Sequence, residues 1–365
     1  MRIQVLTAEG VRNLAPLTLE PRERFNVFVG NNGQGKTNLL EAIYAVAALR
    51  SFRTSRLADM IAFGAQEARI GARVVKDELV RVYEITLGQT GRRVLLDGKA
   101  ARPLARYFGG FNVVVFTPED LALPRGAPGD RRRFLDRAVF NARPDYLASV
   151  QDYEKVLKQR NTVLKMAGQG SMQPARVEEM LSIYDEQLAT LGLAIADARQ
   201  SLVDELRGEL ATAFTAITHT DRKASTRYVS KIAGATTEQI LAWHREGRMK
   251  DLATQSTQLG PHRDDLAFEL DDREAGAFAS QGQLRAIMLA WKTAELAVLA
   301  RTHNDQPILL LDDVSSELDP ARNAYLFEHL ANLAGQCFIT TTHEGHVLLT
   351  RDRANYRIEN GKISS

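Results

Sequence analysis

The sequence predicts a two-lobed α/β protein, with a head that contains an antiparallel β meander and a second, helical lobe that carries a short helical hairpin arm. Three observations predict this fold. A glycine-rich loop stands between a strand pattern and a helix pattern, apolar strands near both ends of the chain stop at polar residues, and a helical period holds for about a hundred residues from Gly126. The chain has 365 residues, more than one core usually supports, so we expect two lobes.

The glycine-rich loop fits the phosphate-binding pattern G-x-x-x-x-G-K-[ST] at every fixed position. Phe25–Val29 before it has the composition of a buried strand, and residues 38–44 after it have the pattern of an amphipathic helix. Glycines let backbone N–H groups turn toward a β-phosphate, Lys36 reaches the β- and γ-phosphates, and the Thr37 hydroxyl holds Mg²⁺. We therefore predict a nucleoside triphosphate site at Gly30, Asn31, Asn32, Gly33, Gln34, Gly35, Lys36 and Thr37.

Composition is that of an ordinary soluble globular protein, with 44% hydrophobic and 25% charged residues. No apolar run approaches the ~20 residues of a membrane span, and the N-terminus has a strand pattern and no signal-peptide pattern, so we expect a cytosolic protein. The single cysteine, Cys337, excludes an internal disulfide, and its apolar neighbours favour a core position. The formal net charge of +2 does not by itself predict nucleic-acid binding.

The first elements of the head follow in chain order. A strand at residues 3–7 precedes the strand before the phosphate loop, and alternating segments at 69–75, 79–87 and 93–96 indicate an antiparallel meander. Val113–Phe116 has the pattern of a buried strand. Pro118 ends this strand and leaves Glu119 and Asp120 at its carboxyl end, where open α/β sheets usually bind ligands.

The helical lobe is predicted over residues 126–254. Residues 146–164 and 177–202 each place apolar side chains on one face, with Arg160 as the only break, and a glycine- and proline-containing segment separates them. This pattern predicts a helical hairpin. At ~1.5 Å per residue its first arm spans only ~35 Å. Two arrangements remain open, an arm that projects from the head and a helical subdomain packed on the head.

The α/β pattern returns near Gly260, so residues 255–365 are predicted to complete the head that begins with residues 1–125. A strand at 266–270 is followed by Ser280, which is placed to cap a helix. Ile308–Asp312 is a buried strand that ends in two carboxylates, and another buried strand precedes His343. The last two strand patterns flank Asn360 and Gly361, a pair typical of a tight hairpin turn.

Two groups of polar residues in this last segment carry chemistry. Asp312 can complete a Mg²⁺ shell, and Asp313 can accept a proton from an attacking water, although Asp313 could also be a solvated neighbour. Ser280, Gly282 and Gln283 offer a hydroxyl, a glycine amide and a helix N-terminus, which suit an anion. Because the chain already has a phosphate loop, a second phosphate-binding element predicts a second subunit; an ordinary helix cap is the alternative.

In this order the motifs resemble those of ABC-type ATPase heads, specifically the chromosome-maintenance branch that includes Rad50 and SMC proteins. Longer blocks narrow the resemblance to the RecF family of bacterial recombination mediators. These blocks cover both lobes and are Arg12-Asn13, Gly33 to Ile43, Arg50 to Arg53, Thr117 to Leu121, Arg131 to Asp136, Gly260 to Leu266, Ser280 to Gln283 and Leu311 to Asp319.

The resemblance implies an ABC-type P-loop ATPase that uses ATP and Mg²⁺ and forms an ATP-dependent homodimer on DNA, either double-stranded or at single-strand gap junctions. It implies a weak, DNA-dependent ATPase that acts as a switch and works with RecR and RecO to help load RecA. The processes implied are recombinational repair, replication-fork maintenance and the SOS response. No membrane partner is implied.

Matched residue by residue, the resemblance implies that Arg12 and Asn38 join the phosphate loop at the nucleotide and that Glu119 and Asp120 lie near the loop that senses the γ-phosphate. Thr37 and Asp312 are the implied metal ligands, and Lys36, Asp313 and His343 the implied catalytic residues. Ser280, Gly282 and Gln283 would complete the site of the neighbouring subunit. The run from His343 to His346 also fits a polar turn, and it has too few ligands for a zinc site.

Basic clusters in the helical lobe are candidates for DNA contact, with a solvated protein face as the alternative for each. An ABC transporter subunit would share the motifs but needs a membrane partner, and a small-molecule kinase would use the phosphate loop without a signature element in trans. The hairpin and the block at Gly260 argue against the transporter. The basic candidates are Arg131, Arg132, Arg133, Arg222, Lys223, Arg227, Lys231, Arg245, Arg248 and Lys250.

Overall fold

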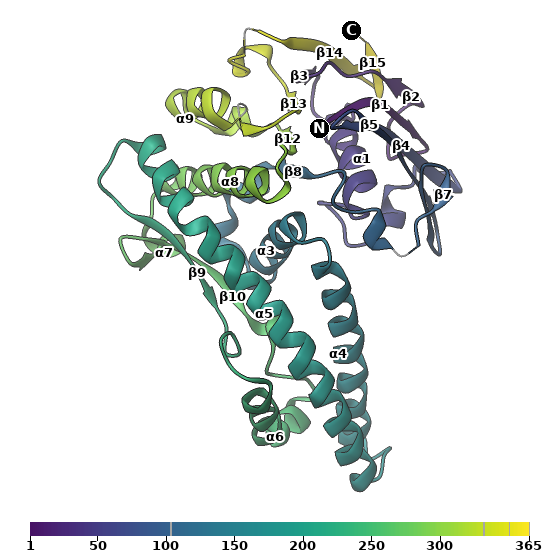
Figure 1. Cartoon of the computed structure of the whole chain (residues 1–365), viewed down its shortest axis with the longest axis vertical. Coiled ribbons are helices and arrows are strands. Elements are labelled where there is room, and N and C mark those ends of the chain that lie inside the picture. The colour runs from purple at the N-terminus through teal and green to yellow at the C-terminus, as the bar shows by residue number, and fades with distance from the viewer. Residues whose placement is uncertain (103, 331–332, 350, 365) are drawn as a thin grey trace. The chain divides into compact units, whose positions relative to one another are not determined.

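The computed structural model describes residues 1–102, 104–330, 333–349 and 351–364 (Figure 1). It divides into two compact units. Unit 1 contains Met1–Ala122, Glu209–Asp221 and Ser280–Ser365, and unit 2 contains Leu123–Gly208 and Arg222–Ala279. None of the helices in the described ranges is long and apolar enough to cross a membrane.

The division differs from the predicted boundaries in two places. Glu209–Asp221, predicted in the helical lobe, belongs to unit 1, and the C-terminal boundary of that lobe also differs. The boundary predicted between residues 125 and 126 lies close to Leu123, where unit 2 begins. The boundary predicted between residues 254 and 255 falls inside unit 2, because strand β10 (Asp265–Leu270) pairs with β9 (Ala224–Val229) along its whole length. The strand at 266–270, which the sequence pattern assigns to the head, therefore belongs to unit 2.

Unit 1 is organised around a six-stranded sheet in the order β15-β14-β3-β13-β12-β8. All neighbours are parallel except β14 and β15. Because parallel strands end at the same edge, the residues that follow β3, β12 and β8 are brought together there. The strands are β3 (Phe25–Val29), β8 (Val113–Phe116), β12 (Ile308–Asp312), β13 (Cys337–Thr341), β14 (Arg353–Glu359) and β15 (Lys362–Ser364).

The second sheet of unit 1 is the predicted antiparallel meander, in the order β2-β1-β4-β5-β6-β7. Helix α1 (Lys36–Ala48) packs against strands of both sheets (Figure 1). Every residue from Leu39 to Ala48 is buried, so the helix that was predicted to be amphipathic is covered all round. The strands are β1 (Arg2–Glu9), β2 (Leu17–Leu19), β4 (Glu67–Lys76), β5 (Leu79–Gly88), β6 (Arg92–Leu96) and β7 (Lys99–Ala100).

The remaining elements of unit 1 are short, apart from α8 (Gln281–His303). Ser280 caps this helix as predicted, since its Oγ accepts a hydrogen bond from the Gln283 N–H while its own N–H donates to Gln283 Oε1. The short elements are η1 (Leu57–Met60), η2 (Leu104–Arg106), α2 (Pro118–Leu121), η5 (Val314–Glu317), α9 (Pro320–Tyr325), η6 (Leu326–Leu330) and η7 (Glu344–His346).

Unit 2 contains the predicted helical hairpin, formed by α4 (Tyr146–Gly168) and α5 (Pro174–Thr218). Helix α5 continues well past the predicted end at residue 202, and its last turns belong to unit 1. A three-stranded sheet, β11-β10-β9, accompanies the helices. The other elements are η3 (Leu123–Arg125), α3 (Pro128–Ala142), α6 (Thr237–Thr254), η4 (Pro261–Arg263), β11 (Arg273–Glu274) and α7 (Ala275–Phe278).

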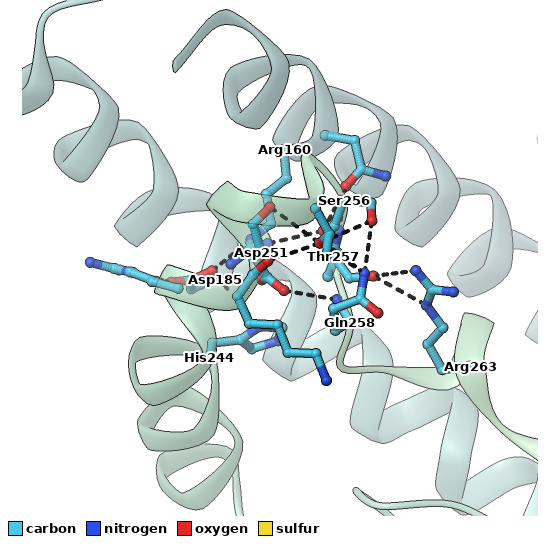
Figure 2. Close-up of polar contacts among 12 residues, drawn as sticks. Arg160, Asp185, His244, Asp251, Ser256, Thr257, Gln258 and Arg263 are labelled. Carbon is cyan, nitrogen blue, oxygen red and sulfur yellow. Dashed lines mark hydrogen bonds and ion pairs between the residues drawn. The ribbon is translucent and has the colours of Figure 1, made fainter. Parts of the chain in front are cut away.

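Arg160, the predicted break in the apolar face of α4, is fully buried. Its Nε donates to Asp185 Oδ1 at 2.8 Å, and its Nη1 donates to Asp251 Oδ2 at 2.7 Å and to Thr257 Oγ1 at 2.9 Å (Figure 2). Arg248 adds a second cation at Asp185. The guanidinium therefore joins α4 to α5, to α6 and to the segment that follows α6, and the break in the apolar pattern is a charged part of the core.

Candidate functional site

A cavity of about 340 Å³ lies at the carboxyl edge of the parallel sheet in unit 1. It brings together the residues that follow β3, β8 and β12, three segments that are far apart in the chain. The sequence placed polar residues after each of these strands, and it was the family resemblance that implied a shared nucleotide site for them. The lining residues are Asn32, Gly33, Gly35, Lys36, Thr37, Asn38, Arg53, Pro118, Glu119, Asp312 and Asp313.

A larger cavity of about 440 Å³ lies over the antiparallel sheet, where Thr7, Arg69 and Glu84 are among its lining residues. Its walls come from strands and contain no helix N-terminus. It has no glycine-rich loop, and its Arg69 is already paired with Glu67, so the smaller cavity is the candidate site.

Lys36 occupies the phosphate-loop position that the pattern requires. Its Nζ donates to the carbonyl oxygens of Gly30 at 2.6 Å and Asn31 at 3.1 Å, so the ammonium group spans the loop. Burial lowers the pKa of Lys36, and the nearby carboxylates of Asp313 and Asp312 act in the opposite direction. The carbonyl oxygens of the phosphate loop thus hold the Lys36 ammonium group at the place where a phosphate would bind.

Thr37 and Asp312 form the candidate metal site. Thr37 Oγ1 donates to Asp312 Oδ1 at 2.9 Å, and Thr340 Oγ1 donates to the same oxygen at 2.8 Å. Burial raises the pKa of Asp312, and Glu119 and Asp313 raise it further because they add negative charge. A hydroxyl beside a buried carboxylate fits Mg²⁺, which takes one or two protein ligands and completes its shell with phosphate oxygens and water.

Asp313 follows Asp312 in a left-handed backbone conformation, with φ of 52°. Its N–H donates to the Thr340 carbonyl oxygen at 3.1 Å, which holds this turn against β13. Its Oδ1 is buried and accepts no hydrogen bond from the described residues. Asp313 lines the cavity, so its carboxylate has the chemistry of a proton acceptor for a bound water.

The predicted acidic pair after β8 separates into two roles. Asp120 is buried, and its Oδ2 accepts a hydrogen bond from the Thr117 N–H in a capping box that starts α2. Glu119 lines the cavity. Only Glu119 is therefore available to a ligand, and Pro118 begins the helix that presents it.

Several predicted site residues lie outside this lining. Gly30, Asn31 and Gln34 line a separate cavity of about 280 Å³ with the last hairpin. Arg12 forms a two-point ion pair with Glu41, through Nε and Nη2 at 3.1 Å each. His343 is exposed after β13, with its ring 5.5 Å from that of His346.

Arg53 is a lining residue that the sequence reasoning did not place in the site. Its Nη1 donates to Asn38 Oδ1 at 2.8 Å and lies 3.4 Å from Glu41 Oε2. Glu41 is fully buried within α1, where it accepts bonds from Arg12 and Ser51 as well. The available signal was a charged residue in the apolar stretch of α1, which requires a cationic partner when buried.

The signature residues Ser280, Gly282 and Gln283 lie at the start of α8 and do not line the cavity. Ser280 is exposed. A Cβ at Gly282 would stand 3.4 Å from Nη2 of Arg322, in the helix that Asp319 caps. The start of α8 thus lies beside the Arg322 side chain of α9 within unit 1, and the exposed serine stays available to another molecule.

Five of the ten basic candidates for DNA contact form ion pairs within unit 2. Arg248 is buried between Asp185 and Glu178, so it serves the fold. Arg245 and Lys250 on α6 are exposed and have no ion pair in the described part of the chain. The other paired arginines are Arg131 with Asp265, Arg133 with Asp130, Arg222 with Asp271 and Arg227 with Glu269.

The block that begins at Gly260 is a packing centre of unit 2. His262 Nε2 lies 3.0 Å from the Thr257 carbonyl oxygen and Nδ1 lies 2.7 Å from the Tyr153 hydroxyl, a pattern that suits a neutral ring. Burial lowers the pKa of His262 to about 4. Arg199 donates to the Pro261 carbonyl oxygen at 2.8 Å. The block thus ties α4 and α5 to the strand that follows it.

A family model described as the RecF/RecN/SMC N terminal domain matches residues 2–364. The DNA replication and repair protein RecF of Geobacter sp. (strain M21) is 39% identical over 375 aligned residues and covers all of both chains. The RecF of Myxococcus xanthus (strain DK1622) is 41% identical over 351 residues, 94% of this chain and 91% of its own. The chain belongs to the RecF family.

Solved structures agree with this assignment. The recombination mediator protein RecF with ATPrS, of the RecFOR pathway, matches with a TM-score of 0.88 at 29% identity and covers 99% of this chain and 97% of that chain. An SMC head bound to the C-winged helix domain of ScpA matches with a TM-score of 0.55 at 15% identity, a likeness of fold alone. The predicted ABC-type ATPase head and the relation of RecF to SMC proteins are confirmed, and the transporter and kinase alternatives are set aside.

Proposed function

We propose that this RecF-family chain is an ATP-dependent switch in DNA replication and repair, and that its ATP-bound form is a homodimer on DNA. The curated relatives are named DNA replication and repair protein RecF, and solved relatives are described as recombination mediator proteins with ATP or ATPrS. The observation that carries the proposal is the cavity at the edge of the parallel sheet. It joins Lys36 and Thr37 of the phosphate loop to Asp312 and Asp313.

Each of these residues has a role that its surroundings support. Lys36 would exchange its carbonyl partners for the β- and γ-phosphate oxygens. Thr37 and Asp312 would hold Mg²⁺, which supplies positive charge to the phosphates. Asp313 would take the proton of the attacking water through its carboxylate, since the residue lines the cavity.

The proposed ATPase is weak and DNA-dependent. Asp313 is one methylene shorter than the glutamate that relatives of the wider ABC class carry, and a misplacement of about 1 Å can cost on the order of 10²-fold in rate. Slow hydrolysis suits a switch, because the ATP-bound dimer then persists while partners assemble on DNA.

The dimer is proposed from the exposed N-terminus of α8. Ser280 and the Gly282 amide would contact the γ-phosphate held by the other subunit, since they do not reach the cavity of their own. Double-stranded DNA and single-strand gap junctions are the proposed nucleic-acid ligands. RecR and RecO are the proposed partners, and help in loading RecA is the proposed activity. The proposed process is the SOS response, and the proposed location is the cytoplasm.

The test is retention of fluorescently labelled gapped duplex DNA by the purified chain. We expect stable complexes with ATP and Mg²⁺, much weaker complexes with ADP, and none with the Lys36→Met variant in the same salt. DNA binding that is equal with ATP, with ADP and in the variant would contradict the switch.

A further inference from the structure

The turn between the last two strands contacts the phosphate loop. Asn360 and Gly361 connect β14 to β15, and both have left-handed backbone, with φ of 48° and 75°. The Gly361 N–H donates to the carbonyl oxygen of Gln34 at 2.9 Å, and the Asn360 N–H donates to Gln34 Oε1 at 2.6 Å. Residues 326 positions apart thus meet through two hydrogen bonds.

A second segment supports the loop beside this turn. Asn13 Nδ2 donates to the carbonyl oxygen of Gly33 at 2.8 Å, and Asn13 Oδ1 accepts from Asn38 Nδ2 at 2.7 Å. The Ala15 N–H donates to the Gly361 carbonyl oxygen at 3.0 Å, which links this segment to the turn. The loop, the segment at Asn13 and the C-terminal turn therefore form one hydrogen-bonded layer.

This layer fixes the direction of two peptide groups in the phosphate loop. In a trans peptide the N–H points opposite to the C=O. The carbonyl oxygens of Gly33 and Gln34 are held toward the donors of the layer, so the N–H groups of Gln34 and Gly35 point away from it. The Gln34 N–H donates to the Asn31 carbonyl oxygen at 3.4 Å within the loop, and the Gly35 N–H is the one left for a phosphate. Gly33 and Gly35 line the cavity assigned to the nucleotide. Inward N–H groups are what a phosphate-binding loop requires.

We propose that the Asn360–Gly361 turn is a positioning element of the nucleotide site, which orients the phosphate loop through Gln34. The inference rests on the proposed binding of ATP in this cavity. The last hairpin turn would then contribute to nucleotide affinity. Gln34 would act as a bracket, meaning the residue that links the turn to the phosphate loop, and not as a phosphate ligand.

Gly361 has no room for a side chain at this contact. A Cβ there would lie 2.0 Å from the Asn13 carbonyl oxygen and 2.9 Å from the Ala15 nitrogen, so the turn would have to move off the layer. Gly98 offers a matched control. It follows Asp97 in the turn between β6 and β7, where φ is 53° and 74°, and a Cβ there meets nothing within 4 Å.

The experiment compares Gly361→Ala, Gly98→Ala and Gln34→Ala in the full chain. Both glycine variants carry the same backbone strain, and only Gly361→Ala displaces the turn. Gln34→Ala removes the side-chain half of the bracket and leaves the hairpin intact. Dissociation constants for ATP and ADP are measured by fluorescence titration, urea unfolding reports stability, and hydrogen exchange of residues 33–37 is followed without nucleotide.

We expect Gly361→Ala to weaken ATP and ADP binding about tenfold, the worth of two hydrogen bonds, and Gln34→Ala about threefold. Gly98→Ala should stay within about twofold of wild type. Exchange at 33–37 should rise in Gly361→Ala alone among the glycine variants. Equal ATP affinity and equal exchange in Gly361→Ala and Gly98→Ala would overturn the positioning role. Absence of ATP binding by the wild-type chain would instead overturn the proposed function, while the exchange measurement would still decide the bracket.

Discussion

Thr37 Oγ1 donates a hydrogen bond of 2.9 Å to Asp312 Oδ1, a residue 275 positions further along the chain. The bond joins the start of α1 to the end of β12 and places a hydroxyl and a buried carboxylate at one point of the cavity. Neither residue alone would hold a divalent cation. Their pairing is what allows the loop and the strand to act as one nucleotide site.

Lys36→Met should weaken ATP binding about 10- to 100-fold, because hydrogen bonds to a charged group contribute about 1.5–3 kcal/mol and the methionine offers none. Dimerisation with ATP should be lost with it. Titration with a fluorescent ATP analogue measures the affinity, and circular dichroism checks that the variant is folded. Undiminished affinity in a folded variant would remove Lys36 from the site.

Asp313→Asn should keep ATP-dependent dimerisation and slow hydrolysis by about 10²–10⁴-fold, because the amide cannot accept the proton of the water. Asparagine tolerates the left-handed backbone at this position, with φ of 52°, so the turn should remain. Glutamate does so less readily, and Asp313→Glu is a poorer test of the same idea. Quench-flow turnover decides the matter, and wild-type turnover in Asp313→Asn would show that another group is the base.

Arg160→Met should lower the free energy of unfolding by about 3–5 kcal/mol, because it leaves Asp185 and Asp251 buried without their shared cation. Arg176→Met is the matched control, since Arg176 and Glu179 form an exposed pair in α5 worth about 0–1 kcal/mol. Urea unfolding followed by circular dichroism gives both values. A similar, small effect in the two variants would contradict the role of Arg160 in the core.

His262 gives a pH dependence with a definite sign. Its pKa in the folded protein is lowered to about 4, chiefly by burial and in smaller part by Arg263 and Arg132, while the hydrogen bond with Thr257 acts in the opposite direction. Between pH 6.5 and 4 the unfolded chain therefore binds a proton that the folded chain does not, so stability falls as the pH falls. From pH 7.5 to 5.5 the wild type should lose about 1 kcal/mol more than His262→Gln. Equal losses in urea unfolding would show that the ring is not held neutral.

The strands, the phosphate loop and the cap at Ser280 could be predicted because their signals are local. Each lies in a short run of residues whose spacing alone is enough to predict its structure. The resemblance implied that Lys36, Asp312 and Glu119 share one site, and the structure gives the physical reason, because parallel strands end at the same edge of a sheet.

What the sequence could not show depends on pairing between distant segments. The end of unit 2 was misplaced because β10 pairs with β9, and a strand pattern does not name its partner. In the sequence Arg160 interrupts the apolar face of a helix. In the structure it is part of the buried face, because its carboxylate partners lie on α5 and α6. The place of Arg53 in the cavity was missed for the same reason, because it depends on an ion pair with Glu41, a buried residue of α1 that is distant in the pattern.

The most direct test of the central claim is molecular mass measured by light scattering on the chain with ATP and Mg²⁺, for Lys36→Met, for Ser280→Arg and for their mixture. Ser280→Arg should bind ATP as a monomer and fail to dimerise, because its side chain would occupy the place of the partner's γ-phosphate. The mixture should restore dimers of mixed composition, since one intact phosphate loop then faces one intact Ser280. The wild type should be monomeric without ATP and dimeric with it. A wild-type mass that does not change with ATP, or a mixture that stays monomeric, would contradict a nucleotide site shared between two subunits.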